Sequence, residues 1–359
     1  MKKVNCFKAF TIIELMVSIF ITITIIASFY KLYEASLRTE RSASIRVAEN
    51  LMGEQILDSL SESFRLIGLN SVASDFRDDG NGIIRKIDTE QSIMEFEYLS
   101  PFGSPVTKVA VSPSTPISDG CEFKLFNSAS FYKSIDKLYF HNQNGLYETS
   151  QISSSNVTYG EDGVTVKVSG FNGTAPGSGS DTCRDVFPVG SLVTGEDFIY
   201  NLKYNPSLSD NYLKLDYKKK DNSGEGNLIN FSYKSNKSDN FYIMPKFVIE
   251  FLGEWECGKD ICRKWLPNGT DYPKDHIKDI VAVRFGFVLL SKKERISKGD
   301  KGSTTDMPRY CIFSVDTGSN NKYCYQFDNL KNSLSYTASV FSRVVYLSNY
   351  RYLKDHAGN

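Results

Sequence analysis

The hydrophobic pattern divides the chain into one long N-terminal helix and a larger remainder, in which short apolar runs alternate with polar loops. Residues 10–30 form a continuous apolar run in which Glu14 is the only charged side chain. In a helix, about 21 residues span roughly 30 Å, the thickness of the hydrocarbon core of a bilayer. The rest of the chain contains no comparably long apolar stretch. Residues 10–30 therefore predict one membrane-spanning helix.

The residues that flank this run predict its orientation. Lys2, Lys3 and Lys8 lie on its N-terminal side, and positive charge is retained in the cytoplasm. The run is longer than the apolar part of a secretory signal peptide, and no small-residue cleavage site follows it. We therefore expect a single-pass membrane protein with a cytoplasmic N-terminus and an exported remainder.

The helical pattern continues beyond the membrane, over residues 31–69. This stretch contains no proline, and its apolar residues recur every three or four positions, which defines one face of an amphipathic helix. That face is broader than the two-position seam of a coiled coil, the alternative interpretation. Gly53 predicts a bend or a close contact inside the helix, and Gly68 predicts its end. The residues of the apolar face are Ile45, Ala48, Met52, Ile56, Leu60, Phe64 and Ile67.

The remaining residues, 70–359, predict a β-rich head. Runs with period-two alternation and with β-branched or aromatic side chains are separated by loops rich in Gly, Ser, Asn and Asp. The expected fold class is α+β, with the long helix packed on an antiparallel β-sheet-rich globular head. The head is large, so we also expect an inserted subdomain around residues 121–240. The expected strands are 93–99, 122–126, 137–141, 164–168, 212–217, 228–234, 241–252 and 309–315.

Composition narrows the class of protein. The chain has 359 residues, 13% of them aromatic, with 42 basic and 42 acidic side chains. A disordered chain would have fewer aromatic residues and a larger net charge. A dedicated nucleic-acid-binding protein would carry a basic excess, which is absent from this sequence.

The start of the apolar run, Phe10-Thr11-Ile12-Ile13-Glu14-Leu15-Met16, resembles that of type IV pilins and pseudopilins. The resemblance covers a short basic leader, a phenylalanine at the cleavage point and a glutamate as fifth residue of the mature chain. It implies that prepilin peptidase removes residues 1–9 by cutting between Ala9 and Phe10, and that methylation makes Phe10 an N-methylphenylalanine. Ala9 stands where the family usually has glycine. The resemblance also implies that Glu14 pairs with the N-terminal amine of a neighbouring subunit, an ion pair that fixes their register.

Three further segments resemble PilW-like minor pilins. They are the helix end at residues 64–69, a late core strand at 280–291 and a closing strand at 344–351. This resemblance implies a pilin fold and a non-enzymatic subunit that takes part in type IV pilus assembly, at or near the pilus tip on the cell surface. Its partners would be prepilin peptidase, other minor and major pilins, and the inner membrane before assembly.

Other functions remain open at this point. The nearest alternative is a J-type pseudopilin of a type II secretion system. The large head also permits a pilus-displayed module for cell adhesion or DNA binding, with an unknown tip ligand. A membrane-tethered enzyme is the third alternative, which the lack of a recognisable nucleophile motif among scattered histidines disfavours. No cofactor is expected.

The seven cysteines divide between two compartments. Cys6 lies in the leader, and six cysteines fall on the exported, oxidising side. Six cysteines allow 15 pairings, which sequence alone does not resolve. Neighbour pairing is the simplest hypothesis. It joins Cys121 to Cys183, Cys257 to Cys262 and Cys311 to Cys324.

Metal binding has little support. The cysteine spacing, with four residues between Cys257 and Cys262, does not fit a zinc site. Asp75, Asp78 and Asp79 lie beside turn glycines and offer oxygen ligands that calcium accepts. Their spacing differs from that of an EF-hand loop, so a solvated turn after the helix is the preferred interpretation.

Overall fold

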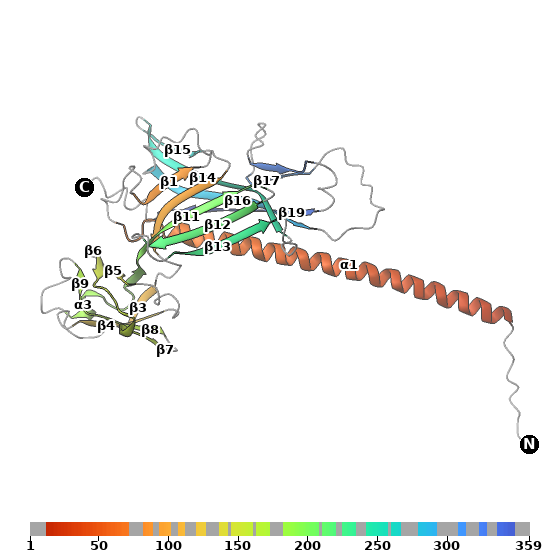
Figure 1. Cartoon of the computed structure of the whole chain (residues 1–359), viewed down its shortest axis with the longest axis horizontal. Coiled ribbons are helices and arrows are strands. Elements are labelled where there is room, and N and C mark those ends of the chain that lie inside the picture. Colours follow the sequence, from red (N-terminus) through yellow and green to blue (C-terminus); the bar gives the residue numbers. More distant parts are fainter. Residues whose placement is uncertain are drawn as a thin grey trace, which may run out of the picture.

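The computed structural model of the chain consists of one long helix that projects from a β-sheet head (Figure 1). The N-terminal end of the helix lies far from the head, and the C-terminal part of the helix lies against it. The structure describes residues 12–71, 82–88, 93–101, 107–111, 120–126, 136–142, 145–160, 163–172, 182–207, 210–219, 225–234, 242–257, 260–266, 279–292, 308–313, 323–328 and 336–348.

The long helix α1 runs from Ile12 to Arg65 without interruption. Its end falls four residues before the expected boundary at residue 69. Residues 66–70 form turns instead, closed by hydrogen bonds from the amides of Leu66 and Ile67 to the carbonyls of Ser63 and Phe64. Gly68 has φ of 81°, a left-handed conformation that favours glycine. The helix therefore ends just before the glycine that predicts its end.

Two antiparallel sheets pack around the end of α1. The five-stranded sheet has the order β1-β2-β11-β12-β13, and the four-stranded sheet has the order β15-β14-β16-β19. The strands of the first are Ile84–Asp88, Met94–Pro101, Asp197–Asn205, Asp210–Lys219 and Glu225–Lys234, in that order. Those of the second are Asp260–Leu266, Tyr242–Cys257, Ile280–Lys292 and Tyr336–Tyr346.

A small hairpin lies against the four-stranded sheet. It consists of β17, Arg309–Cys311, and β18, Cys324–Gln326, which are joined by the Cys311–Cys324 disulfide. Ile312 and Phe327 pack on Ile243, Val248, Val288 and Leu290 in a core of their own. The disulfide thus closes a hairpin that covers the side of the sheet away from α1.

Between β2 and β11 the chain forms a second lobe, residues 107–195. Its eight strands have the order β7-β8-β4-β3-β10-β5-β6-β9 and enclose a separate core around Phe123, Phe140 and Phe187. The Cys121–Cys183 disulfide ties β4 to the short helix α3, Cys183–Val186. The strands in chain order are Thr107–Val111, Cys121–Leu125, Leu138–Asn142, Gly145–Thr149, Val157–Gly160, Gly163–Val168, Phe171–Asn172 and Leu192–Gly195, with a 3₁₀ turn at Ser154–Asn156.

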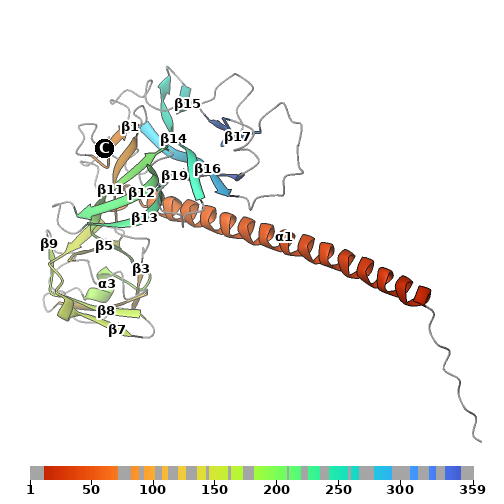
Figure 2. The ribbon, with the colours of Figure 1, turned by 45° about the vertical axis from the view of Figure 1, so that its right-hand side comes forward.

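The second lobe lies beside the C-terminal end of α1, as Figures 1 and 2 both show. It begins and ends earlier in the chain than the expected subdomain at 121–240. The strands β12 and β13 lie outside it, because β12 pairs with β11 and β13 pairs with β12 in the five-stranded sheet. The strands β2 and β11 pair directly with each other, so the lobe emerges between two hydrogen-bonded neighbours.

The main core of the head is built around one face of α1. Ile56, Leu57, Leu60 and Phe64 of the helix, and Ile67 of the turn after it, are buried among side chains of both the five-stranded and the four-stranded sheets. The ring of Phe64 meets Phe96 and Tyr98 of β2 at 5.7 and 5.5 Å, and Phe285 of β16 at 5.2 Å, between ring centroids. These edge-to-face contacts place Phe64 where the helix and the two sheets meet.

Gly53 allows α1 to approach β19 closely. A methyl group at this position would overlap the ring of Phe341, which lies directly over the helix. Of the two roles expected for this glycine, a close contact is the one that the structure contains. Beyond it, Arg343 of the same strand pairs with Asp58 and, at 3.0 Å, with Glu54 of the helix.

A polar cluster joins the end of α1 to the second lobe. Asn70 Nδ2 donates to the carbonyl of Gly195 at 2.6 Å, and its Oδ1 accepts from the hydroxyl of Thr194. The same hydroxyl oxygen lies 3.0 Å from Nε2 of His141 in β5. Burial lowers the pKa of His141 to about 4. The cluster therefore connects the turn after α1 with β10 and β5 through groups that are largely shielded from water.

The strand predictions are mostly confirmed. The closing strand β19 spans Tyr336–Tyr346, so it begins before the expected 344–351, and residues 349–351 lie outside the described residues. Of the expected strand at 309–315, Arg309–Cys311 forms β17, residues 312–313 form a bend, and residues 314–315 lie outside the described residues. The α+β layout, with one long helix and an antiparallel head, is as expected.

We predict that Phe64→Ala lowers the free energy of unfolding of the head by about 3–5 kcal/mol, because it leaves a cavity where the helix and two sheets meet. Denaturant unfolding of the full chain in detergent micelles, followed by near-UV circular dichroism, measures the change. The matched control is Leu51→Ala, since Leu51 lies on the same helix with 60% of its side-chain surface exposed. Equal stabilities for the two variants would contradict the role given to Phe64.

We also predict a pH dependence that originates at His141. Its ordinary pKa of 6.5 applies in the unfolded chain, whereas the folded value is about 4. The unfolded state therefore binds the proton first as pH falls, so the second lobe loses stability between pH 6.5 and 4, by up to about 3 kcal/mol. Its stability should not change through this group above pH 6.5. Thermal unfolding of His141→Gln at several pH values should show a shallower slope in that window than the parent protein.

Candidate functional site in the exposed half of the long helix

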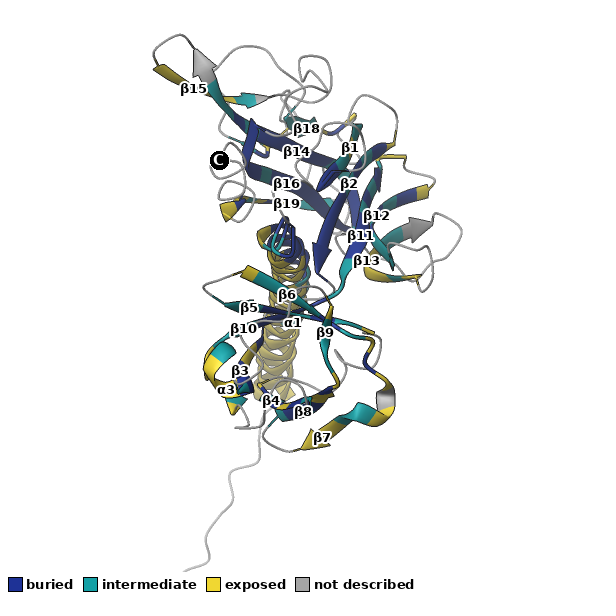
Figure 3. Ribbon diagram, turned by 90° about the vertical axis from the view of Figure 1, so that its left-hand side faces the viewer, coloured by how far each residue is buried: buried dark blue, intermediate teal, exposed yellow. Residues whose placement is uncertain are grey.

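The N-terminal half of α1 projects from the head with its apolar side chains exposed. From Ile12 to Tyr33 the large hydrophobic residues keep about half or more of their surface accessible, and Figure 3 shows this part of the helix as exposed. The most apolar 18-residue window has a mean hydropathy of 2.3, and none of it is buried in the head. The structure thus has one helix long and apolar enough to span a membrane.

Hydroxyl side chains within this segment satisfy their own hydrogen-bonding needs. Ser18 donates to the carbonyl of Glu14 at 2.8 Å, and Thr22 donates to that of Ser18 at 2.7 Å. Thr24 and Ser28 make the same i to i−4 bonds. Such bonds remove the cost of placing these donors in hydrocarbon. The serines and threonines are therefore compatible with an apolar environment.

Glu14 lies in the first turn of α1, one and two helical turns before Ser18 and Thr22 on one face. Its carboxylate interacts favourably with the positive end of the helix dipole. That interaction contributes about 0.3–1 kcal/mol, less than the cost of placing an unpaired carboxylate within hydrocarbon. In an apolar environment a carboxylate is best stabilised by a cationic partner.

The exposed half is held to the head at its junction by a buried glutamate. Glu49 is fully buried between α1 and the four-stranded sheet, where its Oε2 accepts from Ser291 Oγ at 2.7 Å and Thr337 Oγ1 at 3.2 Å. These two residues come from neighbouring strands, β16 and β19. The bonds fix the rotation of the helix relative to the sheet at the point where α1 leaves the head.

The structure locates some of the predicted site residues. Glu14 lies in α1, and the disulfides Cys121–Cys183 and Cys311–Cys324 are the pairs that neighbour pairing predicts. Cys262 is disulfide-bonded, and the side chain of Cys257 lies outside the described residues, so this third pairing stays a prediction. The cleavage-site residues Ala9 and Phe10, and the calcium candidates Asp75, Asp78 and Asp79, also lie outside the described residues. Among the residues that the structure describes, no cluster of His, Cys, Asp and Glu could hold a metal.

Sequence reasoning missed a second buried charge in the head. Glu250, 1% exposed, accepts from Nε of Arg284 at 2.6 Å and from the hydroxyl of Tyr323. The guanidinium of Arg284 also lies over the rings of Trp265 and Phe313, at 4.5 and 4.3 Å. The available signal was a glutamate in a run of apolar strand residues, but its partners lie 34 and 73 positions away.

The comparisons with known proteins identify no relative. No family model, curated protein or solved structure matches this chain. Any function must therefore be argued from the residues themselves.

We predict that charges placed in the exposed apolar segment prevent stable membrane association. The double variant Ile21→Lys, Ile25→Lys should be extracted from membranes by alkaline carbonate, because each lysine costs about 2.5–3.5 kcal/mol at the centre of a spanning helix. The control is Val47→Lys, Leu51→Lys, which has the same spacing at exposed positions outside the apolar run. Retention of both variants in the membrane pellet would contradict a spanning role for residues 12–30.

Proposed function

We propose that the protein is a PilW-like minor pilin with a pilin fold, which takes part in type IV pilus assembly at or near the tip. The observation that carries this proposal is the position of Glu14, a carboxylate in the first turn of an exposed apolar helix. A simple membrane anchor has no need of this charge. A helix that packs against other helices gains from it, because the charge selects a cationic partner and one axial register.

The proposed mechanism has two stages. In the inner membrane, with the head in the periplasm, prepilin peptidase cuts between Ala9 and Phe10, and the new amine of Phe10 is methylated. The helix then leaves the bilayer and joins the helical core of the filament, where its apolar side chains are buried against other major and minor pilins. Glu14 pairs with the N-terminal amine of a neighbouring subunit, so the charge costs less in the filament than in lipid.

The structure of the junction supports this transfer. One face of the last three turns of α1 is buried in the head, and Glu49 and Gly53 fix the helix against β16 and β19. Because these contacts fix the helix to the head, a force applied to the exposed half moves the helix and the head together. A J-type pseudopilin of a type II secretion system would use the same features, so the filament in which the protein is found decides between the two.

N-terminal mass spectrometry tests the processing step. The mature protein should begin at Phe10 and carry one additional methyl group on its α-amine. A strain that lacks prepilin peptidase should instead retain residues 1–9 on the protein. A membrane-bound form in the normal strain that still begins at Met1, or at any residue other than Phe10, would refute the proposed cleavage.

Substitution of Glu14 tests the assembly step. Glu14→Ala should lower the amount of the protein in sheared pili at least tenfold relative to the membrane pool, because the amine of the neighbouring subunit loses its partner. The control is Glu40→Ala, which removes a carboxylate from an exposed position of the same helix beyond the apolar run. Immunoblots of pilus and membrane fractions give both ratios. Equal incorporation of the two variants would remove the role assigned to Glu14.

A further inference from the structure

The outer face of the five-stranded sheet is polar, in contrast to its inner face. Along β11, Phe198, Tyr200 and Leu202 point into the core that α1 shares. The alternate residues Asn201 and Lys203 point to the opposite face, as the period of two in a strand requires. This face points away from α1, and the assembly role proposed for α1 does not involve it.

Four polar side chains form a row across this face. In the register of the sheet, Glu97 of β2 pairs with Asn201 of β11, Asn201 with Asp216 of β12, and Asp216 with Asn227 of β13. A β-bulge between Leu215 and Asp216 interrupts the regular pairing of β12 with β13. Bulges re-aim side chains, and they are frequent next to binding sites.

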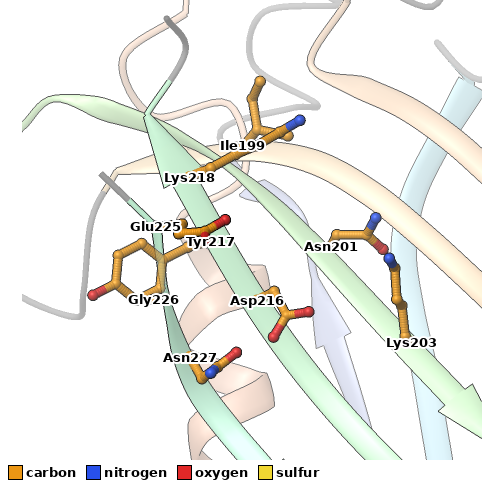
Figure 4. Close-up of a pocket in the computed structure, with 9 residues that line it drawn as sticks. All are labelled: Ile199, Asn201, Lys203, Asp216, Tyr217, Lys218, Glu225, Gly226 and Asn227. Carbon is orange, nitrogen blue, oxygen red and sulfur yellow. The ribbon is translucent and has the colours of Figure 1, made fainter. Parts of the chain in front are cut away.

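A pocket of about 500 Å³ opens at this row (Figure 4). Its size falls in the range of small-molecule sites. Side chains from β11, β12 and β13 line it, and Asp216 lies between Asn201 on one neighbouring strand and Asn227 on the other. The lining residues are Ile199, Asn201, Lys203, Asp216, Tyr217, Lys218, Glu225, Gly226 and Asn227.

The pocket offers more hydrogen-bond acceptors than its own donors satisfy. Asn201 Oδ1 and Asp216 Oδ1 are buried, and neither has a hydrogen-bond partner within the chain. Burial raises the pKa of Asp216, and the nearby charges of Lys203 and Lys214 oppose this shift. Lys203, the nearest cation along β11, has its Nζ 3.5 Å from Glu95. Buried acceptors without partners are costly, and a ligand with donor groups would remove that cost.

The mixed charges of the lining disfavour both divalent cations and strong anions as ligands. Lys203 and Lys218 would repel a divalent cation, and Asp216 and Glu225 would repel a phosphate or another strong anion. A neutral hydroxyl group suits every member of the set, since it donates to the carboxylates and amide oxygens and accepts from lysine and amide nitrogens. Ile199 adds an apolar surface for the C–H groups of such a molecule.

We propose that this pocket binds a hydroxyl-rich small molecule of the saccharide class, with Asn201 and Asp216 as its central hydrogen-bonding residues. Glu225, Asn227 and Lys218 would contact the remaining hydroxyl groups. The site lies on the head alone, so the proposal stands independently of how α1 is used.

Titration of the full-length protein tests the proposal, in a detergent without sugar head groups. The probes are glucose, galactose, N-acetylglucosamine and glucosamine, each measured by isothermal titration calorimetry and by saturation-transfer NMR. At least one should bind saturably, with a Kd of about 1 mM or tighter. No saturable binding of any probe at about 10 mM would overturn the proposal.

Three variants at two pocket residues then locate the binding. Asn201→Ala and Asp216→Ala should each weaken binding of the same sugar at least tenfold, and Asp216→Asn, which keeps the size of the side chain, should weaken it in the same direction. The control is Glu122→Ala, which removes an exposed carboxylate of the second lobe. Near-UV circular dichroism verifies that each variant is folded. Binding unchanged in folded variants of Asn201 and Asp216 would place the sugar elsewhere and refute the site.

Discussion

The structure depends on the burial of one face of α1 between two sheets. Phe64 is the central residue of this contact, because its ring touches β2 of the five-stranded sheet and β16 of the four-stranded sheet. Without the helix, the two sheets would expose much of the largest core of the molecule to water. The helix is therefore an internal element of the head over its last turns and an external apolar rod over its first ones. One continuous secondary-structure element serves both environments.

This dual character explains where polar groups occur along α1. In the projecting half, hydroxyls bond back to the helix, and Glu14 is the only carboxylate before Tyr33. At the junction, Glu49 is buried and bonded to two strands. Further along, Glu54 and Asp58 are exposed and pair with Arg343. Of these carboxylates, Glu49 is the one that the head buries, and it is also the one that hydroxyl groups of two strands bind.

The sequence predicted the parts of the fold that depend on local periodicity. The long helix, its apolar face at Ile56, Leu60, Phe64 and Ile67, and most strands follow from spacing alone. The limits of the second lobe do not follow from spacing, because they depend on the pairing of β2 with β11 across nearly a hundred residues. For the same reason the row from Glu97 to Asn227 was not predictable, since register is set by tertiary pairing. Glu14 was singled out by its charge in an apolar run, whereas Glu49 looked like any surface position of an amphipathic helix.

The direct pairing of β2 with β11 has a consequence for how the head can vary. Pro101 and Asp197 lie opposite each other at the ends of these strands, so the chain leaves the parent sheet and returns to it at nearly the same point. The second lobe has its own core and its own disulfide, and none of the residues of the core around Phe64 comes from it. Such a lobe can lengthen, shorten or be exchanged over evolutionary time while the register of the parent sheet stays the same. The surface residues of the second lobe can thus diversify while the helix and the two sheets around it remain constant.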